Sequence, residues 1–437
     1  MKIERLVLKN FRGIREMDLE FNEKLTVLIG PNGAGKSSIL HAMALPLSDV
    51  FKQPPYWEKG EMSGVKNSDI LNGESSAQVE VFLKTHGKPD HPDFHLGFSR
   101  DESQGVDGTA TSTLNKSPSV GQMEESLRRD RKSSGSLLAV RYLPERRIGR
   151  GHAEPVSADV LAPKFAYRSA LTSGWGHRQF FSWFRKVQNA DLQSLQVPWA
   201  RALDMLKNGE QPPGTNAHLH AARMSIADFM HANALHYDFG ENTFFVDKDG
   251  QTMSVNQLSD GEKGLLGLVG NLTYRLAVAY SHLTDANELP REAEAVVMID
   301  EMELHLHPKW QRTVVPRLLE TFPNVQFIIT THSPQVLGEI HSKDIILLED
   351  APQGIQHGRF SREVHGMTSG HILEALMGAR ERTGGVEDAI REASAAIERN
   401  DLQRAKELLA ELSEDSRDIP ELERIAMRIR REEAIGQ

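Results

Sequence analysis

The chain has 437 residues but contains no cysteine and no long apolar run. The absence of cysteine excludes disulfides, thiolate zinc sites and cysteine nucleophiles, and it suits a reducing compartment. No stretch of about 18 or more apolar residues is present, so no transmembrane helix is expected. The amino-terminal segment MKIERLVLKNFRG spreads charges among its apolar residues and does not form a secretory signal. We therefore expect a cytoplasmic protein with no membrane association.

An excess of positive charge is also missing, because the formal net charge is −10 at pH 7. A molecule of this charge is not a general polyanion binder, although the basic clusters at 128–132 and 141–150 are local candidates for such contacts. Runs of like charge usually form a solvated surface, and we interpret the first cluster in that way. Hydrophobic residues make up 39% and charged residues 26% of the chain, a balance that supports a packed core.

The order of hydrophobic segments predicts an α/β fold with a mixed sheet. A helix is expected at 36–47, ending near Pro46, and a second one at 309–322. Strands separated by helices in this way are typical of a largely parallel sheet that is covered on both faces. The expected strands are residues 2–8, 24–30, 77–87, 94–100, 136–143, 295–301 and 325–333.

Composition divides the chain into four parts. Residues 1–150 and 251–350 form two halves of one domain, 151–250 form an inserted helical lobe, and 351–437 form a carboxy-terminal helical appendage. Residues 101–136, rich in Ser, Gly, Thr and Asp, are interpreted as a flexible insertion in the first half. The aromatic cluster at 180–184 is expected in the core of the lobe. In the appendage, helical spacing broken at Asn400 and Pro420 predicts a hairpin and one more helix.

The segment GPNGAGKSS follows an expected strand and opens an expected helix, which is the setting of a phosphate-binding loop. Its glycines allow backbone N–H groups to turn toward a β-phosphate. The lysine places a positive charge on the β- and γ-phosphate oxygens, and the next serine can bind Mg²⁺. We assign the lysine also to catalysis and that serine also to the metal. The residues predicted to bind the nucleotide here are Gly30, Pro31, Asn32, Gly33, Ala34, Gly35, Lys36, Ser37 and Ser38.

Two acidic residues, Asp300 and Glu301, end the apolar strand AVVMI. A carboxylate at the tip of a core strand can hold Mg²⁺ beside the phosphate loop, and a second one can polarise the attacking water. We assign Asp300 to the metal and Glu301 to the role of general base. His332 follows the strand VQFIITT, where an imidazole can hydrogen bond to the γ-phosphate or to the water, and we assign it to catalysis.

The segment ELHLHP at 303–308 contains His305 and His307 and so invites a metal interpretation. A dedicated metal site needs a third or fourth ligand and identifiable partners around its ligands. We therefore favour a loop that touches a neighbouring subunit.

The segment LSDGEK at 258–263 places small residues before a helix and so forms a second candidate anion site. Together with the motifs above, it resembles the signature motif of the ABC-type ATPase heads of the RecF, SMC and OLD-nuclease kind. The resemblance covers residues 1–48 and 250–350 well and the middle of the chain in outline. It implies that ATP and Mg²⁺ are the ligands and that two heads pair around ATP. The residues expected to face the γ-phosphate held by the opposite subunit are Ser259, Asp260, Gly261 and Glu262.

The opening strand of such heads is matched by NFRG at 10–13, which implies that Arg12 lies near the nucleotide. The compact head without long heptads, followed by a helical tail, resembles the PtuA family of ATPases from Septu antiphage systems. That resemblance implies a regulatory ATPase that forms a homodimer or a higher homo-oligomer. It also implies a separate HNH nuclease (PtuB-like) as partner, and DNA as a target reached through the complex.

No Asp-x-Asp pair follows His332, so a Toprim nuclease site within this chain is not expected. Two alternative functions stay open. One is a RecF-like DNA repair or recombination ATPase that acts on DNA by itself. The other is a nucleotide-locked scaffold with little turnover, against which Glu301 argues because a pure lock has no need of a base.

Overall fold

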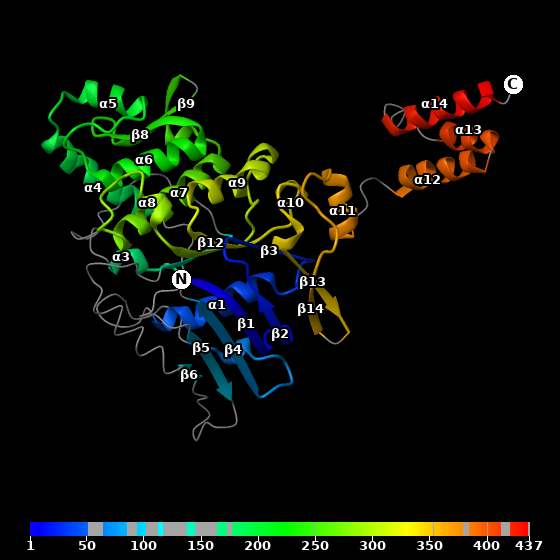
Figure 1. Ribbon diagram of the computed structural model, residues 1–437, viewed down its shortest axis with the longest axis horizontal. Coiled ribbons are helices and arrows are strands. Elements are labelled where there is room, and N and C mark those ends of the chain that lie inside the picture. Colours follow the sequence, from blue (N-terminus) through cyan, green and yellow to red (C-terminus); the bar gives the residue numbers. More distant parts are fainter. Residues whose placement is uncertain are drawn as a thin grey trace. The chain divides into compact units, whose positions relative to one another are not determined.

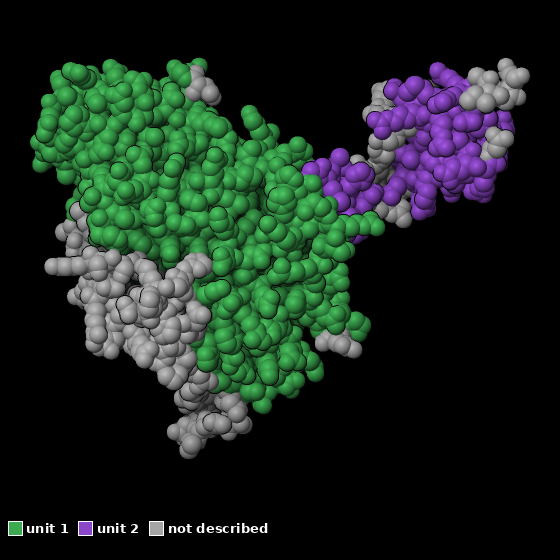
Figure 2. All heavy atoms as spheres, viewed as in Figure 1, with its two compact units in different colours: residues 1–365 green, residues 366–437 purple. Residues whose placement is uncertain are grey.

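The computed structural model describes residues 1–50, 64–84, 94–101, 112–116, 138–144, 164–172, 177–248, 250–352, 354–378, 384–399, 401–411 and 420–435. The chain divides into two compact units, residues 1–365 and 366–437, which are green and purple in Figure 2. All residues that the sequence assigns to nucleotide, metal or catalysis belong to the first unit.

A six-stranded sheet in the first unit positions the phosphate loop (Figure 1). Its strands are β3 (Leu25–Ile29), β7 (Ala139–Tyr142), β11 (Ala295–Ile299), β12 (Val325–Thr330), β13 (Ile345–Ala351) and β14 (Gly354–Arg359). The order is β14-β13-β3-β12-β11-β7, and all neighbours are parallel except the β13–β14 hairpin. The carboxyl ends of the parallel strands meet at one edge, so the segments that follow β3, β11 and β12 gather there.

Burial and connections agree with the predicted α/β class. Every residue of β3, β11 and β12 is buried, which is typical of strands covered on both faces. Helix α9 (Pro308–Thr321) connects β11 with β12, as predicted, and α10 (Pro334–Leu337) follows β12. The mixed α/β fold predicted from the sequence is confirmed.

A second, antiparallel sheet covers the other side of the first helix. Its strands are β1 (Lys2–Phe11), β2 (Ile14–Glu20), β4 (Ser76–Lys84), β5 (Phe94–Asp101) and β6 (Ser112–Lys116), in the order β2-β1-β4-β5-β6. Helix α1 (Lys36–Val50) contacts β4 and β5 of this sheet and β7 and β12 of the first one. Within the predicted insertion 101–136, the structure describes the end of β5 and the strand β6, and the remainder lies outside the described residues.

Helix α1 is longer than the sequence predicts. A proline removes one backbone donor and crowds the preceding turn, so an end near Pro46 is expected. The helix instead continues to Val50 with Pro46 inside it. Leu45, Leu47 and Ser48 beside the proline are buried, and the Ser48 hydroxyl donates to the Leu45 carbonyl at 2.7 Å. Packing between the sheets therefore outweighs the loss of one helical hydrogen bond.

The inserted lobe contains helices and a small sheet of its own. The helices of the lobe are α3 (Lys164–Tyr167), α4 (His177–Ser194), α5 (Trp199–Lys207) and α6 (Ala217–Met230). Helices α7 (Asp260–Ala279) and α8 (Leu289–Glu292) follow in the segment 251–350 and pack against them. Residues 151–163 of the predicted lobe lie outside the described residues. The aromatic cluster 180–184 is buried, as predicted, and α4 packs closely on α7: a Cβ on Gly270 would lie 2.6 Å from the Phe180 ring.

The expectation of helix throughout 151–250 is wrong for residues 232–248. They form the antiparallel strands β8 (Ala232–Asp238) and β9 (Thr243–Lys248), and β10 (Gln251–Ser254) pairs with β9 just beyond the predicted lobe. His231 ends α6 with a left-handed φ of 51°, and its backbone N–H donates to the Ala227 carbonyl. The strand β9 ends at Lys248, whose ammonium group bonds to Glu262 in the first turn of α7.

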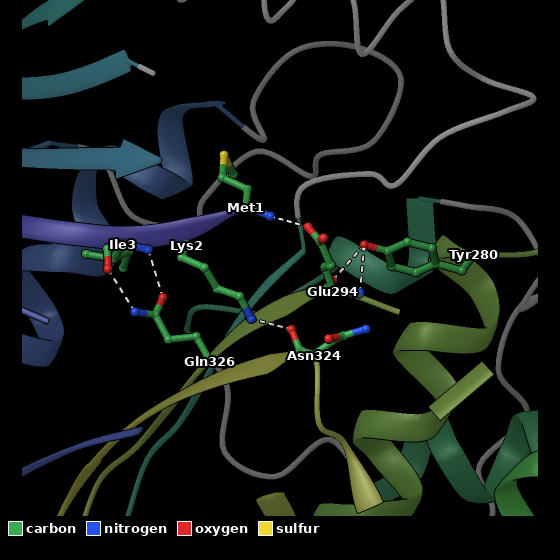
Figure 3. A network of polar contacts seen from close by, with 7 residues as sticks. All are labelled: Met1, Lys2, Ile3, Tyr280, Glu294, Asn324 and Gln326. Atoms are coloured by element: carbon green, nitrogen blue, oxygen red, sulfur yellow. Dashed lines mark hydrogen bonds and ion pairs between the residues drawn. The ribbon is translucent and has the colours of Figure 1, made fainter. Parts of the chain in front are cut away.

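The first strand joins the two sheets at the amino ends of β11 and β12, away from the phosphate loop (Figure 3). The side-chain amide of Gln326 donates to the Ile3 carbonyl at 2.8 Å and accepts from the Ile3 N–H at 2.7 Å. Beside it, the Lys2 ammonium donates to the Asn324 carbonyl. Lys2 is buried, and burial lowers its pKa to about 8 although the charge of Glu294 opposes the shift. This contact fixes β1 to the sheet that carries the site.

The second unit is helical and has a core of its own. Its helices are α11 (Ser369–Met377), α12 (Gly384–Glu398), α13 (Leu402–Glu411) and α14 (Pro420–Ile435). The predicted hairpin and additional helix are confirmed as α12, α13 and α14, and Pro420 begins the last of them, where its missing N–H is tolerated. The hydrophobic core between these helices is formed by Ala393, Ala396, Ile397, Ala405, Leu408, Ile425 and Ile429. Across both units, no helix in the described part of the chain is long and apolar enough to cross a membrane.

Candidate nucleotide-binding site

The phosphate loop joins β3 to α1 and depends on three glycines for its shape. Gly30, Gly33 and Gly35 have φ values of 150°, 87° and 83°, which residues with a Cβ rarely adopt. A Cβ on Gly30 would also lie 2.3 Å from the carbonyl oxygen of Leu348 in β13. The first N–H groups of a helix have no partner within the helix. The loop and the start of α1 can therefore bind an anion together.

Lys36, the first residue of α1, is buried, with 7% of its surface exposed. Its ammonium group donates to two carbonyl oxygens of the loop, at 2.8 and 2.9 Å. Burial lowers the pKa of Lys36, and the carboxylates of Asp300, Glu301 and Glu303 oppose that shift. The structure thus brings the loop lysine and the acidic end of β11 into one electrostatic group, as the sequence predicts for Asp300 and Glu301.

Asp300 and Glu301 are both oriented by one residue of the neighbouring strand. The Thr330 hydroxyl donates to Asp300 Oδ1 at 2.7 Å and accepts from the Glu301 N–H at 2.8 Å. Asp300 is 2% exposed, whereas Glu301 is half-buried with a left-handed φ of 50°. This conformation is uncommon for a residue with a side chain and turns the chain sharply after the strand. Thr330 is not predicted from the sequence as a site residue.

His332 follows β12 and lies in the same group of charges. Its backbone N–H donates to Glu303 Oε1 at 2.6 Å. Burial, followed by the positive charge of Lys36, lowers the pKa of His332 against the opposing carboxylates. The imidazole is therefore neutral at neutral pH and can both donate and accept a hydrogen bond. Glu303 is also missed by the sequence prediction, although a third carboxylate two residues after Glu301 is a visible signal.

Arg12 follows β1 and pairs with Asp69. Its Nε donates to Asp69 Oδ1 at 2.9 Å, and its backbone N–H donates to the Asp69 carbonyl at 2.7 Å. On the phosphate-loop helix nearby, His41 Nδ1 lies 3.1 Å from Arg141 Nη1. Burial, then the charges of Arg12 and Arg141, lower the pKa of His41 to about 4. Arg141, from the basic cluster 141–150, is buried, and burial lowers its pKa to about 10 although the charge of Asp300 opposes the shift. The charge of Arg12 therefore acts on His41, a residue of α1.

Ser259 is the N-cap of α7 and forms a capping box with Glu262. Its hydroxyl accepts from the Glu262 N–H at 3.3 Å and donates to Glu262 Oε2 at 2.8 Å. A Cβ on Gly261 would lie 2.6 Å from the His305 carbonyl oxygen, so the segment 303–308 packs directly against the start of α7. Residues 259–262 and 30–38 all belong to the described chain, and no hydrogen bond or ion pair joins these two segments.

The donor set fits a nucleoside triphosphate with Mg²⁺. Ser37 is exposed in the first turn of α1, and Asp300 is buried at the edge of the sheet. These two residues could hold Mg²⁺, which usually takes one or two protein oxygens and completes its shell with phosphate and water. In the described part of the chain, no group of three His, Asp or Glu side chains could hold a metal ion by itself.

A phosphate loop after β3, carboxylates after β11, a histidine after β12 and a capped signature helix together define a P-loop ATPase head of the ABC type. The chain belongs to the family described as "AAA domain, putative AbiEii toxin, Type IV TA system", whose model matches residues 25–338. The chain is therefore an ATPase, and the match includes the loop, the signature segment, the carboxylates and His332.

Relatives of this chain include ATPases from retron and Septu systems. It is 26% identical over 433 residues to "Retron Ec83 probable ATPase" of Escherichia coli, covering 87% of this chain and 77% of that protein. It is 24% identical over 397 residues to "Septu protein PtuA" of Bacillus thuringiensis, covering 87% of this chain and 85% of that protein. A match to "Retron Vc95 probable ATPase" of Vibrio cholerae is 45% identical over 103 residues but spans only 24% of this chain and 19% of that protein. The predicted resemblance to PtuA is confirmed.

Solved structures with a related fold include the SMC head domain from Thermotoga maritima. It superposes with a TM-score of 0.43 and 16% sequence identity, over 83% of this chain and 100% of that one.

Proposed function

We propose that two copies of this chain pair around ATP, and that the cycle of ATP binding and hydrolysis controls a partner nuclease in antiphage defence. One observation carries the pairing. The chain has two segments suited to phosphate, at 30–38 and 259–262, and no hydrogen bond or ion pair joins them within one chain. A second copy supplies the missing half of each site.

Each residue of the first segment has a distinct role in this proposal. The backbone N–H groups of the loop and the ammonium of Lys36 bind the β- and γ-phosphates. Ser37 and Asp300 hold Mg²⁺, which supplies charge neutralisation on the phosphates when bound. Glu301 orients and deprotonates the attacking water, and neutral His332 hydrogen bonds to the γ-phosphate. Thr330 holds these two residues in register by donating to the Asp300 carboxylate and accepting from the Glu301 backbone N–H.

The defence role is supported by the relatives, two of which are retron ATPases and one a Septu protein. The resemblance to the Septu family favours an HNH nuclease as a separate partner, with DNA as the target of the complex. In this proposal the nuclease activity belongs to that partner. Co-purification with an HNH protein encoded by a neighbouring gene tests this part. If the chain gives full antiphage defence without such a protein, this part is contradicted.

The pairing is tested by mixing two inactive variants. Lys36→Ala removes the phosphate-loop lysine, and Ser259→Arg blocks the signature; each alone should hydrolyse ATP at background rate. Random mixing makes about half of the dimers heterodimers, each with one intact composite site, so up to about a quarter of wild-type activity should return. Both variants must be folded, and heterodimers must form in the mixture. If no activity then returns, the idea that each site is shared between two subunits is contradicted.

Trapping provides a readout other than turnover. Glu301→Gln should bind ATP, hydrolyse it at least about 100-fold more slowly, and accumulate as an ATP-bound dimer or higher oligomer seen by light scattering. Wild-type turnover in this variant would remove Glu301 from its role as base.

A further inference from the structure

Glu262 places a negative charge beside a segment that the proposed function brings to a phosphate. Its Oε2 accepts from the Ser259 hydroxyl at 2.8 Å and from the Ser259 N–H at 3.1 Å. Burial alone would raise the pKa of Glu262, but hydrogen bonds from Lys248 and Ser259 hold the pKa below its ordinary value. The carboxylate is therefore ionised at neutral pH, and its charge needs compensation when an anion approaches.

Lys248, the last residue of β9, provides that charge. Its ammonium donates to Glu262 Oε1, the oxygen that Ser259 does not use. Both side chains are only 18% exposed, so their interaction is screened less by water than a surface ion pair. The same ammonium lies 5.8 Å from the ring centre of Trp310 in the first turn of α9. Lys248 is thus held between the signature helix and the helix that follows the segment 303–308.

The other lysine at this helix end does not meet the same need. Lys263 pairs with Asp260 at 3.7 Å, but the Asp260 side chain is 91% exposed. An ion pair in that position contributes little, because water and salt screen it.

We propose that Lys248 is a positioning residue of the signature motif, which neutralises Glu262 and so allows Ser259 to meet the γ-phosphate of the opposite subunit. This inference rests on the proposed pairing of heads. The Ser259 hydroxyl has one proton, which it donates to Glu262 in the structure. When that proton turns to a phosphate oxygen, Glu262 keeps the Ser259 N–H and Lys248 as donors. Without Lys248, a bare carboxylate would oppose the incoming anion with only one hydroxyl group between them.

The test compares the assembly of a single variant with that of a charge-balanced double variant. Lys248→Gln removes the cation, and Lys248→Gln/Glu262→Gln removes both charges of the pair. Repulsion between two like charges about 4 Å apart at a protein surface weakens an association constant by about tenfold or more. A symmetric dimer has two such sites, so Lys248→Gln in a Glu301→Gln background should weaken ATP-dependent pairing about 100-fold. The double variant should recover most of that loss, and Lys248→Arg should pair nearly normally.

Two further measurements separate positioning from general weakening of the fold. Lys207→Gln is the matched control, because Lys207 pairs at 3.5 Å with Asp247, the neighbour of Lys248 on the same strand, yet faces no part of the signature. It should leave pairing unchanged even if it lowers the melting temperature. In the otherwise wild-type enzyme, Lys248→Gln should raise the protein concentration that gives half-maximal turnover, whereas Lys207→Gln should leave that concentration at the wild-type value.

The outcomes are distinct. Two results would overturn the role of Lys248. One is that Lys248→Gln pairs at the same protein concentration as the protein with native Lys248, and the other is that the double variant pairs as weakly as Lys248→Gln alone. If Lys248→Gln fails to fold, the Lys248→Arg variant and the double variant still decide, since both keep a balanced charge. If the Glu301→Gln protein with native Lys248 stays monomeric with ATP, the proposed pairing itself fails, and this inference fails with it.

Discussion

The packing of the signature helix against its own chain gives a prediction for two neighbouring glycines. A methyl group on Gly261 would lie 2.6 Å from the His305 carbonyl oxygen, whereas one on Gly264 would meet nothing within 4 Å outside its helix. Ordinary C···O contacts are about 3.3 Å or longer, so Gly261→Ala forces the helix or the segment to move by about 0.7 Å. Such overpacking costs about 1–3 kcal/mol, while replacing Gly by Ala in a helix gains up to about 1 kcal/mol.

Gly264→Ala is therefore the matched control, because it has the gain in helix propensity without the clash. We expect Gly264→Ala to be more stable than Gly261→Ala by about 1–3 kcal/mol, measured as the difference between their urea unfolding free energies at equal m-values. Gly261→Ala should also lose ATP-dependent pairing, since the start of α7 is displaced. Equal stability of the two variants, within about 0.5 kcal/mol, would refute a direct contact between α7 and the segment 303–308.

Two further predictions concern buried ionisable groups. Burial, and next the charge of Arg223, lowers the pKa of His220 to about 4, so between pH 6.5 and about 4 the unfolded chain binds a proton that the folded chain excludes. Stability should fall as the pH drops through that window, by up to about 3 kcal/mol, and His220→Gln should reduce the fall in urea midpoint; an unchanged slope would contradict it. Burial lowers the pKa of Lys2 from 10.5 to about 8, so the unfolded chain keeps a proton across that range that the folded chain has lost. Stability should rise as the pH increases from about 8 to 10.5, and Lys2→Met should remove this rise in thermal unfolding curves; a rise that persists would place its origin elsewhere.

Four strands of the main sheet, β3, β7, β11 and β12, could be predicted because they are short apolar runs, and the phosphate loop because a strand and a helix flank it. The strands β13 and β14 were not predicted, and β14 lies within 351–437, where the sequence predicted a helical appendage. The partners that orient the site could not. Thr330 reaches both Asp300 and Glu301 only because β12 lies beside β11 with Ile299 opposite Ile329, and no local pattern specifies that register. Glu303 was visible as a carboxylate, but its bond to the His332 backbone depends on the same alignment.

The errors at Pro46 and at 232–248 have one physical cause. In both places a local signal was overridden by burial: the proline is surrounded by buried neighbours inside α1, and β8 and β9 are largely buried and pair with each other. Propensity contributes a few tenths of a kcal/mol for an ordinary residue and about 3 kcal/mol for a proline inside a helix. Burying each large apolar side chain contributes about 1.5–3 kcal/mol, and both Leu45 and Leu47 beside the proline are buried. Packing therefore decides such segments, and packing cannot be seen from a single sequence.

One short segment, residues 301–305, lies between the phosphate loop and the signature helix α7 of the same chain. Residues 301–305 begin at Glu301, beside the phosphate loop of their own subunit, and end at His305, against the helix that would serve the ATP of the other subunit. In the proposed pairing, a displacement of α7 when Ser259 meets a phosphate would be transmitted over a few residues to Glu301, the proposed base of the same subunit. If the two sites act independently, a mixture of Lys36→Ala and Ser259→Arg should reach about a quarter of wild-type turnover. Recovery clearly above background but well below a quarter, with heterodimers formed in the expected proportion, would show that each intact site needs the signature contact at the other.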